Sequence, residues 1–128
     1  MRVLLDTHIA LWAVAGSAML ASEAKAAILA ADEVLVSVAS LWEIAIKHGL
    51  GKGRMPVSSA QALQAFVDAG YDLLDVTAAH VVRVESLPRI HKDPFDRLLV
   101  AQALLEPLIL ITRDPVVARY SSTVLKVA

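Results

Sequence analysis

The sequence contains no cysteine, which excludes disulfide bonds and thiolate metal sites. Its N-terminus also lacks a basic region followed by an apolar core and a small-residue cleavage site, the pattern of a secretory signal peptide. No apolar run reaches the roughly 18 residues of a membrane-spanning helix. The longest candidate, residues 98–112, is interrupted by Gln102, Glu106 and Pro107. We therefore expect a cytoplasmic protein that is not inserted in a membrane.

Internal repeats, low-complexity runs and linkers are also absent, and 128 residues are enough for one domain with its own core. We expect a single domain over residues 1–128. The chain is 57% hydrophobic and its mean hydropathy is +0.61, which is high for a soluble protein. We interpret this excess as a full core plus an apolar surface for a partner or for self-association.

The net charge is only −1, so the composition lacks the basic excess that is typical of a dedicated nucleic-acid-binding protein. Two local basic clusters are present, one of Lys47, Lys52 and Arg54 and another of Arg89, Lys92 and Arg97. They could flank an acidic site without changing the total charge. They could also be the solvated ends of helices and loops.

Strand and helix signals alternate along the chain. Strands are predicted at residues 3–6, 34–37, 71–75, 109–112 and 123–127, and the central ones are apolar throughout, as in a sheet that is covered on both faces. Helices are predicted at residues 7–15, 22–31, 38–48, 59–69, 78–86 and 94–105. This alternation predicts an α/β sandwich with a mostly parallel central sheet.

Acidic residues follow the strand signals. Asp6 ends the first strand, Glu43 lies in the helix after the second, and Asp114 follows the fourth. Asp96 lies in the first turn of the helix that begins at Pro94. Strand ends and the helix starts beside them converge on one crevice in such a sheet, so we expect these four carboxylates to form one site, with Asp93 as a further candidate.

Each of these acids also has a structural interpretation. Asp6 can cap the helix that follows it, and Asp93 and Asp114, each followed by proline, can be N-caps with proline at the first helical position. Glu43 has the spacing for a capping box with Ser40 or an ion pair with Lys47. However, Ser37 is the better-placed cap, and the helix around Glu43 is apolar nearly all round. We therefore expect Glu43 to face the interior.

Other residue types give weaker indications. The histidines (His8, His48, His80 and His91) show no paired ligand spacing and are interpreted as structural or surface residues. Trp12 and Trp42 are interpreted as core or interface residues, and Gly49 as the left-handed residue that ends a helix. Thr7 and Thr112 are candidates for orienting a water.

The clustering of carboxylates indicates a cation. Crowded carboxylates repel one another, and some must bind protons near neutral pH unless a cation compensates. An all-oxygen ligand set without cysteine favours a hard ion, Mg²⁺ or Mn²⁺, over zinc. A divalent ion held by carboxylates can activate water and neutralise charge on a phosphate. The pattern therefore predicts metal-dependent hydrolysis of a phosphate ester.

Four motifs together resemble the PIN-domain ribonucleases, and in particular the VapC-type toxins of toxin–antitoxin pairs. They are Leu4-Leu5-Asp6-Thr7-His8, Ser40-Leu41-Trp42-Glu43-Ile44, the run from His91 to Leu99, and Ile111-Thr112-Arg113-Asp114. Each motif is weak alone, but the ordered set is specific and spans essentially the whole chain.

The resemblance implies a three-layer α/β/α sandwich that cleaves RNA with Mg²⁺ or Mn²⁺. The acidic site of the family carries over onto Asp6, Glu43, Asp96 and Asp114, and Asp93 belongs to a variant of the third motif found in a subset of the family. The resemblance also implies a homodimer that is held inactive by a small antitoxin whose tail lies over the acidic site, often with an inserted arginine.

Two other interpretations remain open, and one is rejected. The chain could be a general RNA-processing nuclease, or a non-catalytic partner-binding module in which the acids are only caps. A phospho-acceptor receiver domain has a similar length and architecture, but it needs adjacent acids after the first strand. Here Asp6 is followed by Thr7, and we reject that interpretation.

Overall fold

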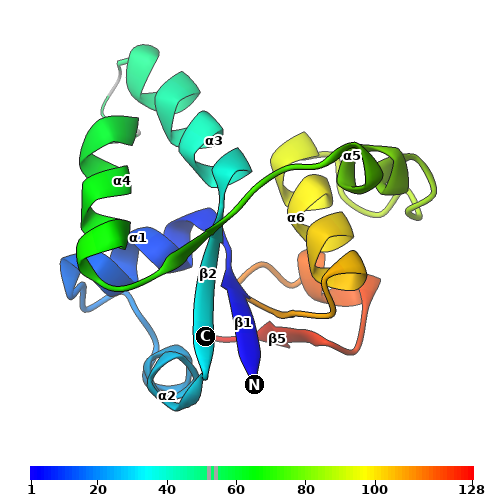
Figure 1. The fold of residues 1–128 in the computed structure, drawn as a ribbon, viewed down its shortest axis with the longest axis horizontal. Helices are drawn as coiled ribbons and strands as arrows, with labels where there is room; N and C mark the ends of the chain where they lie inside the picture. The colour runs from blue at the N-terminus through cyan, green and yellow to red at the C-terminus, as the bar shows by residue number, and fades with distance from the viewer. Residues whose placement is uncertain (52, 54) are drawn as a thin grey trace.

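In the computed structural model, which describes residues 1–51, 53 and 55–128, one sheet lies between two layers of helices (Figure 1). The strands are β1 (Arg2–Leu5), β2 (Glu33–Ser37), β3 (Asp72–Leu74), β4 (Ile109–Thr112) and β5 (Val124–Lys126). The helices are α1 (Thr7–Ala15), α2 (Ser22–Ala30), α3 (Val38–Gly49), α4 (Ser59–Asp68), α5 (Ala78–Glu85) and α6 (Pro94–Leu105), with a 3-10 helix η1 (Val117–Tyr120). The predicted α/β/α fold is confirmed.

All strand pairs are parallel, and the strand order is β3-β2-β1-β4-β5. The chain starts in the middle of the sheet, extends to one side with β2 and β3, and then returns to the other side with β4 and β5. The carboxyl ends of β2 and β4 therefore flank the end of β1. This is the switch point at which open α/β sheets place their ligands.

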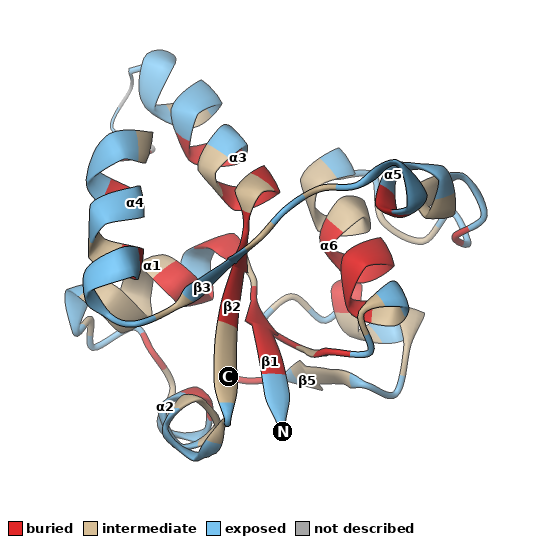
Figure 2. Cartoon of the chain, in the orientation of Figure 1, coloured by how far each residue is buried: buried red, intermediate tan, exposed pale blue. Residues whose placement is uncertain are grey.

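Successive strand residues face opposite layers, which divides the core into two parts. In β1, Val3 and Leu5 pack with the α1–α4 side, whereas Leu4 packs against α6. All three side chains are fully buried. Figure 2 shows the same division, with buried residues on the strands and on the inner sides of the helices. Because both faces are covered, the strands are apolar throughout rather than alternating.

The helix starts carry the caps that the sequence indicates. Asp6 caps α1, Ser37 caps α3, and Asp93 caps α6 with Pro94 at its first position. No helix within residues 1–51, 53 and 55–128 is both long enough and apolar enough to cross a membrane.

Two local predictions are wrong. Gly49 is the last residue of α3, and the positive φ lies at Gly51 (φ 70°). Asp114 does not directly precede a regular helix: its side chain accepts from the N–H of Val116, and the 3-10 helix η1 begins at Val117. The predicted basic cluster beside Lys47 includes Lys52 and Arg54, which lie outside the described residues.

Candidate active site

The four predicted acids lie together at the carboxyl edge of the sheet. They line one pocket of about 420 Å³, which we call the acidic pocket. Its lining residues are Asp6, Thr7, His8, Trp12, Glu43, Lys47, Asp93, Asp96, Arg113 and Asp114. Asp6, Glu43, Asp96 and Asp114 come from four separate segments, so the fold gathers carboxylates that are far apart in the sequence.

Asp6 lies at the centre of this edge, between β1 and α1. Its Oδ1 accepts the N–H of Ile9 at 2.9 Å, and its Oδ2 accepts the hydroxyl of Thr112 at 2.5 Å. Burial raises the pKa of Asp6, although these two hydrogen bonds and the charge of His8 act in the opposite direction. Asp6 is thus a helix cap, as its structural interpretation predicts, and also a partly buried acid whose charge the protein does not fully compensate.

Glu43 faces the interior, as predicted, and its side chain is only 4% exposed. Its Oε1 accepts the hydroxyl of Thr7 at 2.6 Å, and its Oε2 pairs with Nζ of Lys47 at 2.5 Å. The hydroxyl of Ser40 lies 2.9 Å from that of Thr7. The predicted ion pair with Lys47 therefore forms, and it holds Glu43 toward the pocket.

Asp93 and Asp96 both belong to the start of α6. Oδ1 of Asp93 accepts the N–H groups of Phe95 and Asp96 at 2.8 and 3.2 Å. Burial raises the pKa of Asp96 to about 7, and the negative charges of Asp93, Asp6 and Glu43 contribute to the rise. Without a cation, a substantial fraction of Asp96 is therefore protonated near neutral pH.

Asp114 is the most exposed of the four. Burial acts to raise its pKa, but hydrogen bonds from His91 and from the backbone of Val116 outweigh this effect, and the pKa of Asp114 is lowered. His91 is a site residue that the sequence interpretation missed. Its Nε2 lies 2.8 Å from Oδ2 of Asp114 and 3.2 Å from Oδ2 of Asp96. Its position two residues before Asp93, within the same acidic run, is the signal that could have identified it.

Positive charge lies at the edge of the acidic pocket. Lys47, His8 and Arg113 all line it. The guanidinium of Arg113 lies 5.1 Å from the ring centroid of Trp12, and this ring also contacts His8 with centroids 5.8 Å apart. An exposed arginine stacked on an aromatic face is pre-oriented to bind an anion that approaches the acids.

The residues present fit a divalent cation. The partly buried acids Asp6 and Asp96 both have raised pKa values, chiefly because burial disfavours the charged carboxylates, and neighbouring carboxylates add to the rise; a bound cation would oppose both effects. The donors are almost all oxygen atoms, the type that Mg²⁺ and Mn²⁺ prefer. In addition, one ligand atom from each of His91, Asp96 and Asp114 lies within 4.8 Å of the others.

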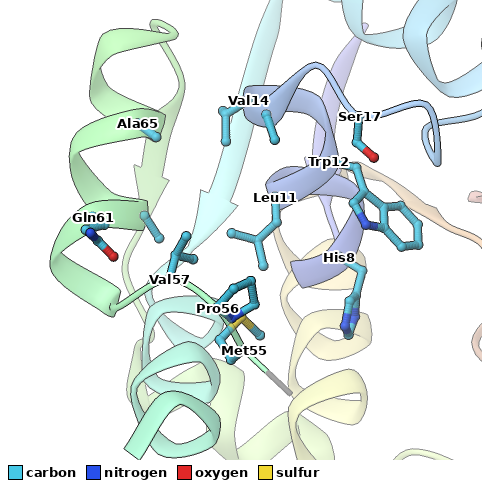
Figure 3. A pocket seen from close by; sticks show the side chains of 12 residues that line it. His8, Leu11, Trp12, Val14, Ser17, Met55, Pro56, Val57, Gln61 and Ala65 are labelled. Carbon is cyan, nitrogen blue, oxygen red and sulfur yellow. The ribbon is translucent and has the colours of Figure 1, made fainter. Parts of the chain in front are cut away.

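A second pocket of about 420 Å³ adjoins the acidic pocket and shares His8 and Trp12 with it. Figure 3 shows it between α1 and α4, with Leu11 and Val14 on one wall and Val57 and Ala65 on the other. We call it the apolar groove. Most of its lining side chains are apolar, in contrast to the acidic pocket beside it.

Comparison with known proteins identifies the class to which this fold and site belong. The PIN domain pattern matches residues 3–122, and the chain is therefore a member of the PIN domain family. No significant match exists among curated proteins.

Solved structures place the fold more narrowly. The chain is similar to VapBC2 from Rickettsia felis, which was crystallised with a DNA fragment from its promoter (16% identity, TM-score 0.71, 98% of each chain covered). A toxin–antitoxin complex from Klebsiella pneumoniae is also similar (20% identity, TM-score 0.67, 97% of this chain and 96% of that chain). So is VapC20 from Mycobacterium tuberculosis, a toxin that cleaves the sarcin–ricin loop (16% identity, TM-score 0.62, 91% and 93%). The expected resemblance to VapC-type chains is confirmed.

Proposed function

We propose that this protein is a metal-dependent endoribonuclease and the toxin of a toxin–antitoxin pair. The observation that carries the proposal is the acidic pocket, where four carboxylates meet and the pKa of Asp6 and of Asp96 is raised. Membership of the PIN domain family and the likeness to toxin–antitoxin chains support it.

In this proposal, Asp6, Glu43, Asp96 and Asp114 hold one or two Mg²⁺ or Mn²⁺ ions, with Asp93 as an additional ligand. Such an ion, when bound, lowers the pKa of a coordinated water and neutralises charge on the phosphate. The protein holds the carboxylates ready: Thr112 and the backbone of Ile9 fix Asp6, and Thr7 and Lys47 fix Glu43. This prior orientation reduces the reorganisation that binding requires.

The cations at the edge of the acidic pocket have a separate role toward the substrate. Arg113, stacked on Trp12, and His8 lie beside the acids and would contact the RNA phosphates that flank the cut. RNA binding then depends on a few local charges, which agrees with a net charge of only −1.

The test is cleavage of single-stranded RNA by the purified protein with Mg²⁺, with Mn²⁺ and with EDTA. We expect cleavage only with a divalent ion and little or none in Asp6→Asn. Asp68→Asn is the matched control, because Asp68 is exposed on α4 and away from the acidic pocket. If Asp6→Asn cuts RNA as fast as the parent, the proposed site is wrong.

The toxin role needs its own test, because a general RNA-processing nuclease would have the same chemistry. Induced expression of the parent should arrest growth, whereas Asp6→Asn at equal soluble level should not. Vigorous growth at high expression of the active parent would favour the RNA-processing role instead.

The apolar groove supports the antitoxin partner. It shares His8 and Trp12, labelled in Figure 3, with the acidic pocket. The apolar groove therefore fits a peptide segment whose apolar side chains are followed by a basic one. Ala65→Glu, on the α4 wall of the apolar groove, should weaken binding of the cognate antitoxin without changing RNA cleavage. Equal affinity of the parent and Ala65→Glu for that antitoxin would place the interface elsewhere.

An exposed apolar row along α3, continued by Leu50 just after the helix ends at Gly49, supports the homodimer. Trp42, Ile46 and Leu50 follow one another at intervals of four residues and are 60%, 41% and 60% exposed. Side chains at this spacing share one side of a helix. A row of large apolar side chains in contact with water is more typical of an interface than of a monomer surface.

A further inference from the structure

His91 looks like a metal ligand when only its position is considered. Its Nε2 faces Asp114 and Asp96, and the three residues offer ligand atoms within 4.8 Å of one another. A nitrogen ligand would change the preference of the site, since imidazole suits transition metals such as zinc better than magnesium.

The hydrogen bond at the other ring nitrogen, Nδ1, determines whether Nε2 is free to bind a metal. The backbone N–H of Asp93 points at Nδ1 of His91, at 3.0 Å. A backbone N–H can only donate, so Nδ1 must be the acceptor and carries no proton. In a neutral imidazole the proton then lies on Nε2. His91 therefore presents an N–H to the two carboxylates and has no lone pair there for a metal.

This pattern is the reverse of the one that metal-ligating histidines show. A ligating histidine donates its second ring N–H to a carboxylate, a carbonyl or a water, which leaves the first nitrogen free to bind the ion. Here the second nitrogen meets a donor instead. Binding a metal through Nε2 would require a proton on Nδ1, opposite the N–H of Asp93, and the hydrogen bond would become a repulsion.

The His91 backbone is fixed by the segment that carries Asp114. Its N–H donates to the hydroxyl oxygen of Tyr120 at 2.7 Å, and Nη1 of Arg97 donates to the same oxygen at 3.2 Å. Tyr120 ends η1, the 3-10 helix that follows the Asp114 turn. Two contacts, one through Tyr120 and one through Asp114, thus join the loop before α6 to the segment after β4.

We propose that His91 is a positioning residue and not a ligand: its Nε2–H holds Asp114 and Asp96 toward each other and keeps the ligand set all-oxygen. The proposal rests on the proposed metal site. Removal of a hydrogen-bond partner of a ligating side chain typically lowers metal affinity by about 10- to 100-fold. His91 also keeps the site suited to Mg²⁺ and Mn²⁺, because it withholds the nitrogen that zinc would favour.

The direct test is the proton position, read from a ¹⁵N–¹H correlation spectrum of histidine-labelled protein. The chain has four histidines, and the signal missing in His91→Gln identifies residue 91. We expect Nε2 of His91 to be protonated and Nδ1 to be unprotonated, both in EDTA and with saturating Mg²⁺. If, in the Mg²⁺ form, Nε2 is unprotonated and Nδ1 is protonated, His91 is a ligand and the proposal is overturned.

His80 provides an internal control for this spectrum. Its Nδ1 accepts the N–H of Thr77 at 3.0 Å and its Nε2 lies 2.6 Å from Oε2 of Glu106, so it has the same bonding pattern as His91. It lies on α5 and does not line the acidic pocket. Its signals should show the same proton position and should not respond to the ion.

Two variants test the positioning role through Mn²⁺ affinity, measured by calorimetry. Asparagine can keep the acceptor for the N–H of Asp93 but is too short to replace Nε2, whereas glutamine can place an N–H near the Nε2 position. We expect Mn²⁺ binding about 10- to 100-fold weaker in His91→Asn, and largely restored in His91→Gln. Unchanged affinity in His91→Asn, or equal loss in both folded variants, would overturn the proposal.

Failure of the proposed nuclease function can be distinguished from failure of the proposal for His91. If the parent binds no Mn²⁺ and cuts no RNA, the metal-dependent nuclease is wrong. The metal-free spectrum then decides by itself whether His91 donates to the two acids.

Discussion

Replacement of Asp96 by asparagine should stabilise the metal-free protein, and the gain should depend on pH. Burial raises the pKa of Asp96 to about 7, with a further contribution from Asp93 and Asp6. The ordinary value is 3.8. Between these two values the folded state keeps a proton that the unfolded state releases. The free energy of unfolding therefore falls as the pH rises through this window and is lowest above it.

The size of the effect follows from the shift. A rise from 3.8 to about 7 is about three pKa units, and each unit corresponds to about 1.4 kcal/mol, so charging Asp96 costs the folded protein at most about 4 kcal/mol. The side chain is 23% exposed, and water screens part of this cost, so we expect about 2 kcal/mol. Asparagine has the same shape and no charge, and it avoids this cost.

The assay is urea unfolding in EDTA, followed by circular dichroism, for the parent, Asp96→Asn and the exposed control Asp68→Asn. Asp96→Asn should match the parent near pH 4 and exceed it by about 2 kcal/mol near pH 8. Addition of Mg²⁺ should make the parent more stable than Asp96→Asn, because the ion stabilises only the protein that binds it. A stability difference that stays constant with pH, or a variant that is less stable at pH 8 in EDTA, would refute the reasoning.

Three further predictions use other contacts of the site and surface. Lys47→Met leaves the buried Glu43 unpaired and should cost about 1–3 kcal/mol of stability in urea unfolding, and adding Glu43→Gln should recover most of it; a double variant as unstable as the single one would contradict this. Thr112→Val removes the hydroxyl that lowers the pKa of Asp6, so the acid limb of the RNA cleavage rate should move to higher pH. Ile46→Lys interrupts the apolar row on α3 and should give a monomer by light scattering, whereas persistence of a dimer would exclude α3 from the interface.

The sequence predicted most of the fold because its elements end at strong local signals. The bounds of α1 and α6 agree with the prediction, since Asp6 and the pair Asp93-Pro94 start these helices. The prediction for Gly49 failed because three glycines lie within residues 49–53, each able to end a helix, and only the backbone geometry selects among them. The 3-10 helix η1 has four residues, too few for any periodicity to show.

The acids were predictable because each follows a strand or starts a helix, and the parallel topology then gathers them. His91 was missed, because no histidine spacing points to it and its place two residues before Asp93 was the one indication in the sequence. Its partners are Asp114, 23 residues later, and the backbone of Asp93, and both contacts depend on the loop before α6. Local sequence determines which residues cap a helix. It does not determine which loop folds back onto the site.

Asp6 caps α1 and also lines the acidic pocket, so its geometry fits both the structural and the functional interpretation, and only a substitution that separates them is informative. Asp6→Asn removes the charge and keeps one oxygen, which can accept the N–H of Ile9, but it replaces the oxygen that accepts the Thr112 hydroxyl with an NH₂ group, to which the Thr112 oxygen can act as acceptor. Asp6→Ala removes the charge and both acceptors. Because burial raises the pKa of Asp6, charge removal should stabilise the metal-free fold at neutral pH. Loss of the cap should cost about 1 kcal/mol.

We therefore expect neither variant to cleave RNA, and Asp6→Asn to unfold at higher urea concentration than Asp6→Ala. Urea unfolding in EDTA at neutral pH measures the difference. If Asp6→Asn were inactive and also less stable than the parent, the charge of Asp6 would be supported by the protein itself. The protein alone would then stabilise the negative charge of Asp6, and the main argument for a metal ion in the acidic pocket would be lost.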